Sequence, residues 1–212
     1  MGKTLTYYGY SRSELLEFVP PDSKKILDIG CGEGLFIKAI KEITKVETWG
    51  LELMPEIAEK AKLNVDKLLI GRVEDLQNSI PDSYFDCIFF NDVLEHLLEP
   101  TDVLKMVKSK LSKEGIIIAS IPNVRYLPNL YELIIKRDWE YKESGILDST
   151  HLRFFTQISM KRMFENAGYK LIRQQGINSF LNPIKFYLFN LLTFKIFSDS
   201  KYMQFVCIAK PF

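Results

Sequence analysis

The sequence predicts an α/β protein with a doubly wound parallel sheet, and three observations support this fold class. Apolar segments of strand length alternate with segments of helical periodicity between residues 25 and 123. The first strand runs into a loop with glycines at alternate positions, Gly30, Gly32 and Gly34. The segment 85–91 (FDCIFFN) is almost continuously apolar, as a strand buried on both faces is. Right-handed crossovers are expected to join these strands into one sheet.

Each element has its own local signal. Helices are expected after Leu35, from Pro55, through Val103 and Val107, and from Thr156 to Gly168. Apolar residues three and four apart mark their buried faces, proline suits a first helical turn, and glycine suits a helix end. The expected strands are 25–29, 46–53, 67–71, 85–91, 115–123, 169–176 and 202–210.

Length, charge and cysteine content narrow the class of protein. The 212 residues suit one domain, and 28 basic against 27 acidic residues give no broad field for nucleic acid. The three cysteines, Cys31, Cys87 and Cys207, are odd in number and far apart, so we expect reduced thiols in the cytoplasm and neither zinc nor disulfides.

Three less regular segments lie within the expected single domain 1–212: an N-terminal lid 1–20, an insertion 124–155 and an apolar insertion 178–198.

The glycine loop is expected to bind a cofactor, because ligands of such sheets bind at the carboxyl ends of the strands. Glu52 ends the second strand, 22 residues after Gly30, and suits both hydroxyls of a ribose. A dinucleotide loop needs a third glycine where this chain has Leu35. Asp28 would repel a pyrophosphate but attract a cationic methionyl group. The spacing therefore favours S-adenosylmethionine over a dinucleotide.

The chain resembles the class I S-adenosylmethionine-dependent methyltransferases over roughly residues 10–175. The motifs that carry the resemblance are ILDIGCGEG, WGLEL, FDCIFFNDVLEHL and LSKEGIIIASIPN. The resemblance implies a Rossmann-like sheet of seven strands in the order 3-2-1-4-5-7-6, with the seventh strand antiparallel and helices on both faces. It extends to methyltransferases found near bacterial surface-polysaccharide genes and to the quinone-biosynthesis O-methyltransferases.

The resemblance also implies roles for the cofactor-binding residues. The methionyl part would lie on the glycine loop, the ribose on the second strand's end and the adenine on the residues that follow. Arg72 departs from the pattern, because relatives often carry there an aspartate for the adenine amino group, and arginine cannot accept a hydrogen bond. Glu74, Asp75 or the backbone at Val73 would take over that role. The other expected contacts are Asp28, Gly30, Cys31, Gly32, Glu52, Leu53, Met54 and, near the transferring methyl group, Asn91.

Two histidines are the candidates for a general base, which a hydroxyl acceptor needs near neutral pH. His96 follows the fourth strand and is the first choice, whereas the insertion would have to bring His151 to the site. The alternative for both histidines is a structural role, in which they orient the loops and do not act as a base. The run Asp92-x-x-Glu95-His96 resembles a stretch that can hold magnesium in the quinone-biosynthesis enzymes, but no metal site is assigned.

The acceptor is expected to lie under the insertion 124–155, where Tyr126, Trp139 and Tyr141 could stack on a ring. A lid containing Tyr7, Tyr8 and Tyr10 would cover the cofactor. We expect transfer to an oxygen of a sugar or related polar metabolite. The alternatives are a quinone-type or aromatic hydroxyl, a reductase dependent on a dinucleotide such as NAD, and a non-catalytic partner that keeps the fold.

The segment 178–198 is unusually apolar but too short to span a membrane. As a helix it would gather Asn182, Lys185, Asn190 and Thr193 on one stripe and leave a broad apolar face. Packing of this face on the insertion or on a second subunit of a homodimer is favoured. Contact with a membrane surface is the alternative.

Overall fold

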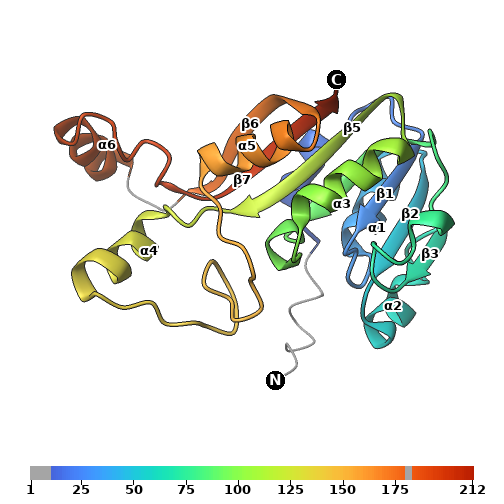
Figure 1. Cartoon of the computed structure of the whole chain (residues 1–212), viewed down its shortest axis with the longest axis horizontal. Coiled ribbons are helices and arrows are strands. Elements are labelled where there is room, and N and C mark those ends of the chain that lie inside the picture. Colours follow the sequence, from blue (N-terminus) through green and yellow to red (C-terminus); the bar gives the residue numbers. More distant parts are fainter. Residues whose placement is uncertain (1–10, 180–182) are drawn as a thin grey trace.

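A computed structural model describes residues 11–179 and 183–212 of the chain. Its centre is one seven-stranded sheet in the order β3-β2-β1-β4-β5-β7-β6 (Figure 1). The first five strands pair in parallel, and β7 runs antiparallel to both β5 and β6. This is the sheet that the resemblance implied. The strands are β1 (Lys25–Ile29), β2 (Glu47–Glu52), β3 (Lys67–Ile70), β4 (Phe85–Asn91), β5 (Leu111–Pro122), β6 (Tyr169–Ser179) and β7 (Tyr202–Pro211).

Helices cover both faces of the sheet. Residues of α3 and α5 share one buried cluster, whereas α1 and the 3₁₀ turn Ser13–Phe18 share another on the opposite face. Helix α5 begins after Thr156, where the sequence predicted a helix start, and the side chain of Thr156 caps it. The helices are α1 (Leu35–Ile43), α2 (Pro55–Ala61), α3 (Pro100–Val107), α4 (Leu127–Tyr131), α5 (Gln157–Asn166) and α6 (Pro183–Leu192).

Strand β4 shows why the sheet needs helices on both sides. Ile88 and Phe90 belong to the cluster under α3 and α5, and Cys87 and Phe89 belong to the cluster under α1. All four side chains are fully buried. Since successive side chains of a strand point to opposite faces, this continuous apolar run places β4 at the centre of two cores.

Both insertions leave the sheet at the same edge, one after β5 and the other between β6 and β7. The antiparallel register pairs Pro122, the last residue of β5, with Gln204 near the start of β7. The insertion 124–155 contains α4 and a π-helical turn, Glu132–Lys136, and is therefore more regular than its sequence indicates. The insertion 178–198 contains α6, as its periodicity predicted. In the part of the chain that the structure describes, no helix combines the length and apolar character needed to cross a bilayer.

Candidate active site

The loop between β1 and α1 is shaped by left-handed glycines. Gly30 has a φ of 75° and Gly32 a φ of 56°, a region that residues with a Cβ enter only at a cost. The backbone N–H groups of Gly30 and Cys31 both donate to the carbonyl of Leu51 in β2, at 2.7 and 3.1 Å. A Cβ on Gly30 would lie 2.5 Å from Cγ2 of Val93, which excludes any larger residue without a shift.

Glu52 holds the glycine loop from the end of β2. Its Oε2 accepts the N–H of Gly32 at 2.9 Å, and its Oε1 accepts the N–H of Met54 at 3.0 Å. The side chain is buried, and a carboxylate oxygen accepts more than one hydrogen bond. Glu52 can therefore shape the loop and still accept from ribose hydroxyls, so the structural and cofactor roles are compatible.

Asp28 is a buried carboxyl group at the mouth of this loop. Burial, and secondly the nearby Glu52 charge, raise its pKa to about 8, although Arg12 opposes the shift. Asn91 donates to Asp28 Oδ1 at 3.4 Å, and its own Oδ1 is buried with no hydrogen-bond partner among the described residues. A buried carboxyl and an open amide oxygen side by side suit an ammonium group, which carries a positive charge and three donors. The methionyl end of the cofactor fits this arrangement.

The remaining expected cofactor residues follow β2 and β3, apart from Cys31 in the glycine loop itself. Leu53 and Met54 are exposed beyond β2, where a ring could cover them. Val73 is buried, and Glu74 pairs with Arg72 at 3.3 Å. Burial and the Asp28 charge raise the pKa of the Cys31 thiol, which makes it a packing residue rather than a nucleophile. The tyrosines of the expected lid, Tyr7, Tyr8 and Tyr10, lie outside the described residues.

A second feature is a small cavity where β4, β5, β7 and the insertion meet. It has a volume of about 130 Å³, and both polar and apolar residues line it. His151 lines it together with Glu95, so the insertion does bring this histidine to the end of β4. The full lining is Asp92, Glu95, Pro122, Gly145, Ile146, His151, Met203 and Gln204.

The two candidate histidines lie next to each other. Their ring centroids are 4.7 Å apart in an edge-to-face arrangement. Nδ1 of His151 lies 2.9 Å from the carbonyl of Ile146, and Nδ1 of His96 lies 3.1 Å from the carbonyl of Thr150. Since a carbonyl only accepts, each Nδ1 carries the proton in the neutral ring and each Nε2 carries the lone pair. His151 lines the cavity, whereas His96 packs behind it.

Glu95 is a site residue that sequence analysis did not assign. It is 1% exposed, and its Oε1 lies 3.9 Å from Nε2 of His151. Its backbone carbonyl accepts the N–H groups of Leu152 and Arg153, at 2.8 and 3.0 Å. Glu95 thus fixes the end of the insertion and places its carboxyl group beside His151. Its position one residue before His96, in a short turn at the end of β4, could have indicated that Glu95 is a site residue.

Asp92 belongs to a different network, which sequence analysis also missed. It has a φ of 55° and forms an ion pair with Arg12. Its Oδ1 accepts from Nε2 of Gln204 at 2.7 Å and from the hydroxyl of Ser120 at 3.4 Å. The expected strand order 5-7-6 could have predicted that Gln204 lies near this site, because it places the start of the last strand beside the end of the fifth.

The site offers one set of metal-ligating groups within the described residues. Glu95, His96 and His151 each offer a ligand atom, and the three atoms lie within 4.8 Å of one another. Two imidazoles and a carboxylate suit a transition metal such as zinc better than magnesium. Asp92, the first residue of the magnesium-type run, is not among them.

The fold and the loop together define a methyltransferase that uses S-adenosylmethionine. Residues 6–174 match the methyltransferase domain family, and the chain belongs to this family. With the seven-stranded sheet, this match makes the chain a class I enzyme. The match does not support the dinucleotide-dependent reductase considered from the sequence.

Curated relatives carry the name ubiquinone biosynthesis O-methyltransferase. The mitochondrial protein of Schizosaccharomyces pombe is 33% identical over 103 residues, which are 46% of this chain and 37% of that protein. The protein of Shewanella sp. (strain ANA-3) is 23% identical over 166 residues, or 76% of this chain and 69% of that protein. The chain therefore matches about a third of the first relative and about two thirds of the second.

Solved structures show the same fold. A SAM-dependent methyltransferase from Archaeoglobus fulgidus superposes with a TM-score of 0.71 at 20% identity, covering 97% of this chain and 96% of that one. At this identity the likeness concerns the fold alone. The cofactor, S-adenosylmethionine, follows from the family and from the loop described above.

Proposed function

We propose that the enzyme transfers a methyl group to a hydroxyl oxygen of a small molecule bound in the cavity under the insertion. One observation carries the proposal: His151, the carboxylate of Glu95 and the end of β4 converge on this cavity. When bound, S-adenosylmethionine supplies a methyl group activated by a positively charged sulfur. The chain must then hold the acceptor, exclude water and take up the hydroxyl proton.

His151 is the group that takes up this proton. The carbonyl of Ile146 holds the proton on Nδ1, so Nε2 accepts the new one. The imidazolium that results gains a negative neighbour in Glu95, 3.9 Å from Nε2. His96 supports the ring of His151 edge-on, which makes it a positioning residue in this proposal. The sequence favoured His96 as the base, and the cavity lining supports His151 instead.

The walls of the cavity favour an aromatic hydroxyl as the acceptor. Pro122, Ile146 and Met203 offer apolar surface to a flat ring, and His151 can accept its hydroxyl proton. The names of the curated relatives point to the same class of acceptor. A sugar hydroxyl is the second candidate, since Asp92, Glu95 and Gln204 could accept from several hydroxyls.

A screen with cofactor labelled in the methyl group tests the proposal. We expect label in monohydric phenols and catechols before sugars, and a methyl ether as the product. Label in sugars alone would support the second candidate. Label on nitrogen or carbon acceptors alone would overturn the proposal. Asp28→Asn, which removes the carboxyl group at the methionyl site, is the control that should lose activity by losing the cofactor.

The cysteines support a reducing compartment. Cys31, Cys87 and Cys207 are free thiols, and all three are buried. Such thiols persist where glutathione keeps proteins reduced, so we propose a cytoplasmic enzyme. A homodimer is a further proposal, which sedimentation of the purified protein would test.

A further inference from the structure

One end of the molecule carries a concentration of apolar side chains on its surface. It is formed by α6 with the turn that follows and by the π-helical turn of the other insertion, which both lie at the left end of the molecule in Figure 1. Leu192 is 80% exposed and Phe194 is 90% exposed. We name this surface the apolar end: Leu133, Ile134, Ile135, Tyr187, Leu188, Leu191, Leu192, Phe194 and Ile196.

The direction in which α6 faces reverses the sequence-based expectation. The predicted polar stripe included Asn190, which is buried, and the predicted packed face included Leu188, Leu191 and Leu192, which are exposed. Among the described side chains of α6, Phe186 is also buried. The helix therefore packs through Phe186 and Asn190 and directs its leucines outward. Apolar residues lie around most of its circumference, so periodicity could not determine the buried side.

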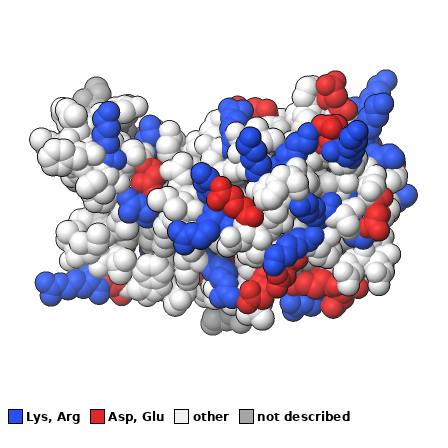
Figure 2. All heavy atoms as spheres, turned by 45° about the horizontal axis from the view of Figure 1, so that its top comes forward, with Lys and Arg blue, Asp and Glu red and all other residues white. Residues whose placement is uncertain are grey.

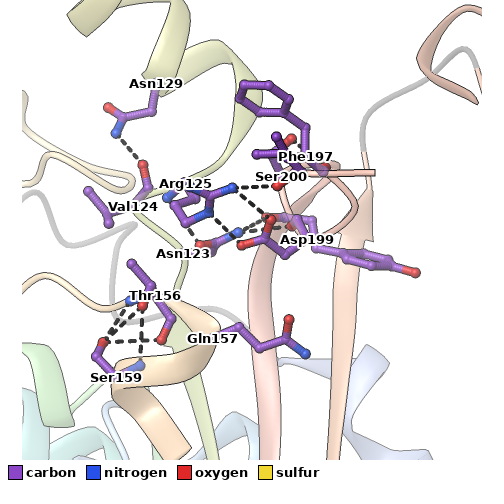
Figure 3. Close-up of polar contacts among 12 residues, drawn as sticks. Asn123, Val124, Arg125, Asn129, Thr156, Gln157, Ser159, Phe197, Asp199 and Ser200 are labelled. Atoms are coloured by element: carbon purple, nitrogen blue, oxygen red, sulfur yellow. Dashed lines mark hydrogen bonds and ion pairs between the residues drawn. The ribbon is translucent and has the colours of Figure 1, made fainter. Parts of the chain in front are cut away.

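A polar clamp joins the two insertions at their bases (Figure 3). Arg125 binds both oxygens of Asp199, Nε to Oδ2 at 2.7 Å and Nη2 to Oδ1 at 3.2 Å. The same Nη2 donates to the carbonyl of Ile196 at 2.8 Å, and Asn123 donates to the carbonyl of Asp199 at 3.0 Å. This clamp keeps the two apolar elements on one end of the molecule.

By sequence the segment 183–201 is net positive, whereas in the π-helical turn Lys136 pairs with Glu132 at 3.0 Å. The segment 183–201 contains Lys185, Lys195 and Lys201, and its one acid, Asp199, is paired with Arg125. Figure 2 shows this end as mostly white lobes with blue Lys and Arg atoms and fewer red Asp and Glu atoms. Nζ of Lys201 lies 5.3 Å from the ring centre of Tyr187, at the edge of the apolar surface. Tyrosine and lysine at the border of leucine and phenylalanine are typical of contacts with the membrane interface.

We propose that the apolar end inserts into the surface of an anionic membrane. The exposed leucines and Phe194 would enter the boundary between headgroups and acyl chains, and Lys195 and Lys201 would contact acidic lipids. The lobes protrude from the body, a shape that suits insertion into lipid (Figure 1). Pro122 and Met203, which line the cavity, lie close in sequence to the bases of the two insertions. The membrane contact does not depend on which hydroxyl accepts the methyl group.

Flotation with lipid vesicles tests this inference. We expect the full chain to float with vesicles of phosphatidylcholine and phosphatidylglycerol, and to bind pure phosphatidylcholine vesicles less. Salt at 0.5 M should weaken binding, because it screens the lysines. Leu192→Glu with Phe194→Glu should lower the partition coefficient at least about tenfold, because two charges would have to enter the interface.

The matched control places the same two charges on the other half of the molecule. Ile43 and Leu63, 60% and 90% exposed, lie at the ends of α1 and α2. Ile43→Glu with Leu63→Glu should float like the wild type. All variants must bind S-adenosylhomocysteine as the wild type does, which shows that they are folded. Equal flotation of the two double variants, or a wild type that ignores anionic vesicles, would overturn the inference. So would a dimer in solution that Leu192→Glu with Phe194→Glu makes monomeric.

Discussion

The glycine loop and the insertion 124–155 lie at the same edge of the sheet, yet they are fixed in different ways. The loop between β1 and α1 is tied to β2 by its own backbone N–H groups and by Glu52. The insertion is tied down at a few points, chiefly the carbonyl of Glu95 and the clamp at Arg125. The first region is built for one cofactor, and the second presents side chains to a cavity. Such a division lets acceptor specificity change without loss of the cofactor site.

The sharpest test of this division is removal of the proposed base. His151→Ala should lower turnover by about 10²–10⁴-fold, the usual contribution of a general base. Affinity for S-adenosylhomocysteine should stay within about twofold, because the loop contains no part of the insertion. Titration calorimetry and initial rates measure the two quantities separately.

His96→Ala is the companion variant. It removes a ring that supports His151 edge-on but does not line the cavity, so we expect a loss under about tenfold. Near-normal turnover in His151→Ala together with a large loss in His96→Ala would reverse the two roles. Full turnover in both variants would show that the acceptor needs no base. An acceptor group that is already ionised would behave in this way.

The glycines offer a second comparison of the two regions. Gly30 and Gly145 both have positive φ, 75° and 88°, so alanine is strained at each. A Cβ on Gly30 would clash with Val93, whereas no atom lies within 4 Å of a Cβ on Gly145. Gly30→Ala should cost about 2–4 kcal/mol of unfolding free energy and Gly145→Ala about 1 kcal/mol. Urea denaturation measures both, and equal costs would contradict the loop geometry.

The sequence predicted the strands, because a short continuous apolar run such as that of β4 is typical of a strand buried on both faces. The resemblance supplied the strand order. The sequence also predicted that Asp28 and Glu52 lie at the glycine loop, since the position of an acid near a strand end determines where it lies. The convergence of His151 on Glu95 lay beyond prediction, because it depends on how a segment of little periodicity returns to the sheet. The Arg12 contact with Asp92, 80 positions apart in the chain, is of the same kind.

Asp28 links the cofactor region to pH. In the empty site its pKa is about 8, so the carboxyl is largely neutral at pH 6. A bound ammonium group favours the carboxylate, so binding must release the proton. Affinity for S-adenosylhomocysteine should therefore rise with pH between 6 and 8, by up to about tenfold per unit. Calorimetry in buffers of different ionisation enthalpy should detect proton release at pH 6.5, and Asp28→Asn should abolish both the release and the slope.

The same carboxyl should make the empty protein less stable as the pH rises. Its folded-state pKa of about 8 exceeds the ordinary 3.8, so between these values the folded chain holds a proton that the unfolded chain releases. This contribution to stability is lost progressively as the pH rises from about 4 to about 8. Asp28→Asn should therefore raise the melting temperature of the empty enzyme at pH 8 while weakening cofactor binding. A melting temperature equal to or below that of the wild type would argue against a buried, ionisable Asp28.

The smallest expected effect concerns metal. Glu95, His96 and His151 could gather around a transition metal, but the proposed mechanism uses His151 as a base, and Nε2 cannot bind a metal and take up a proton at once. Prolonged dialysis against EDTA should therefore leave turnover within about twofold of its starting value, and metal analysis of the active enzyme should find less than one equivalent. Loss of activity on dialysis, restored by zinc or manganese and not by magnesium, would make the three residues a metal centre. His151→Ala would then lose metal and activity together, and the metal in place of the histidine would activate the acceptor hydroxyl.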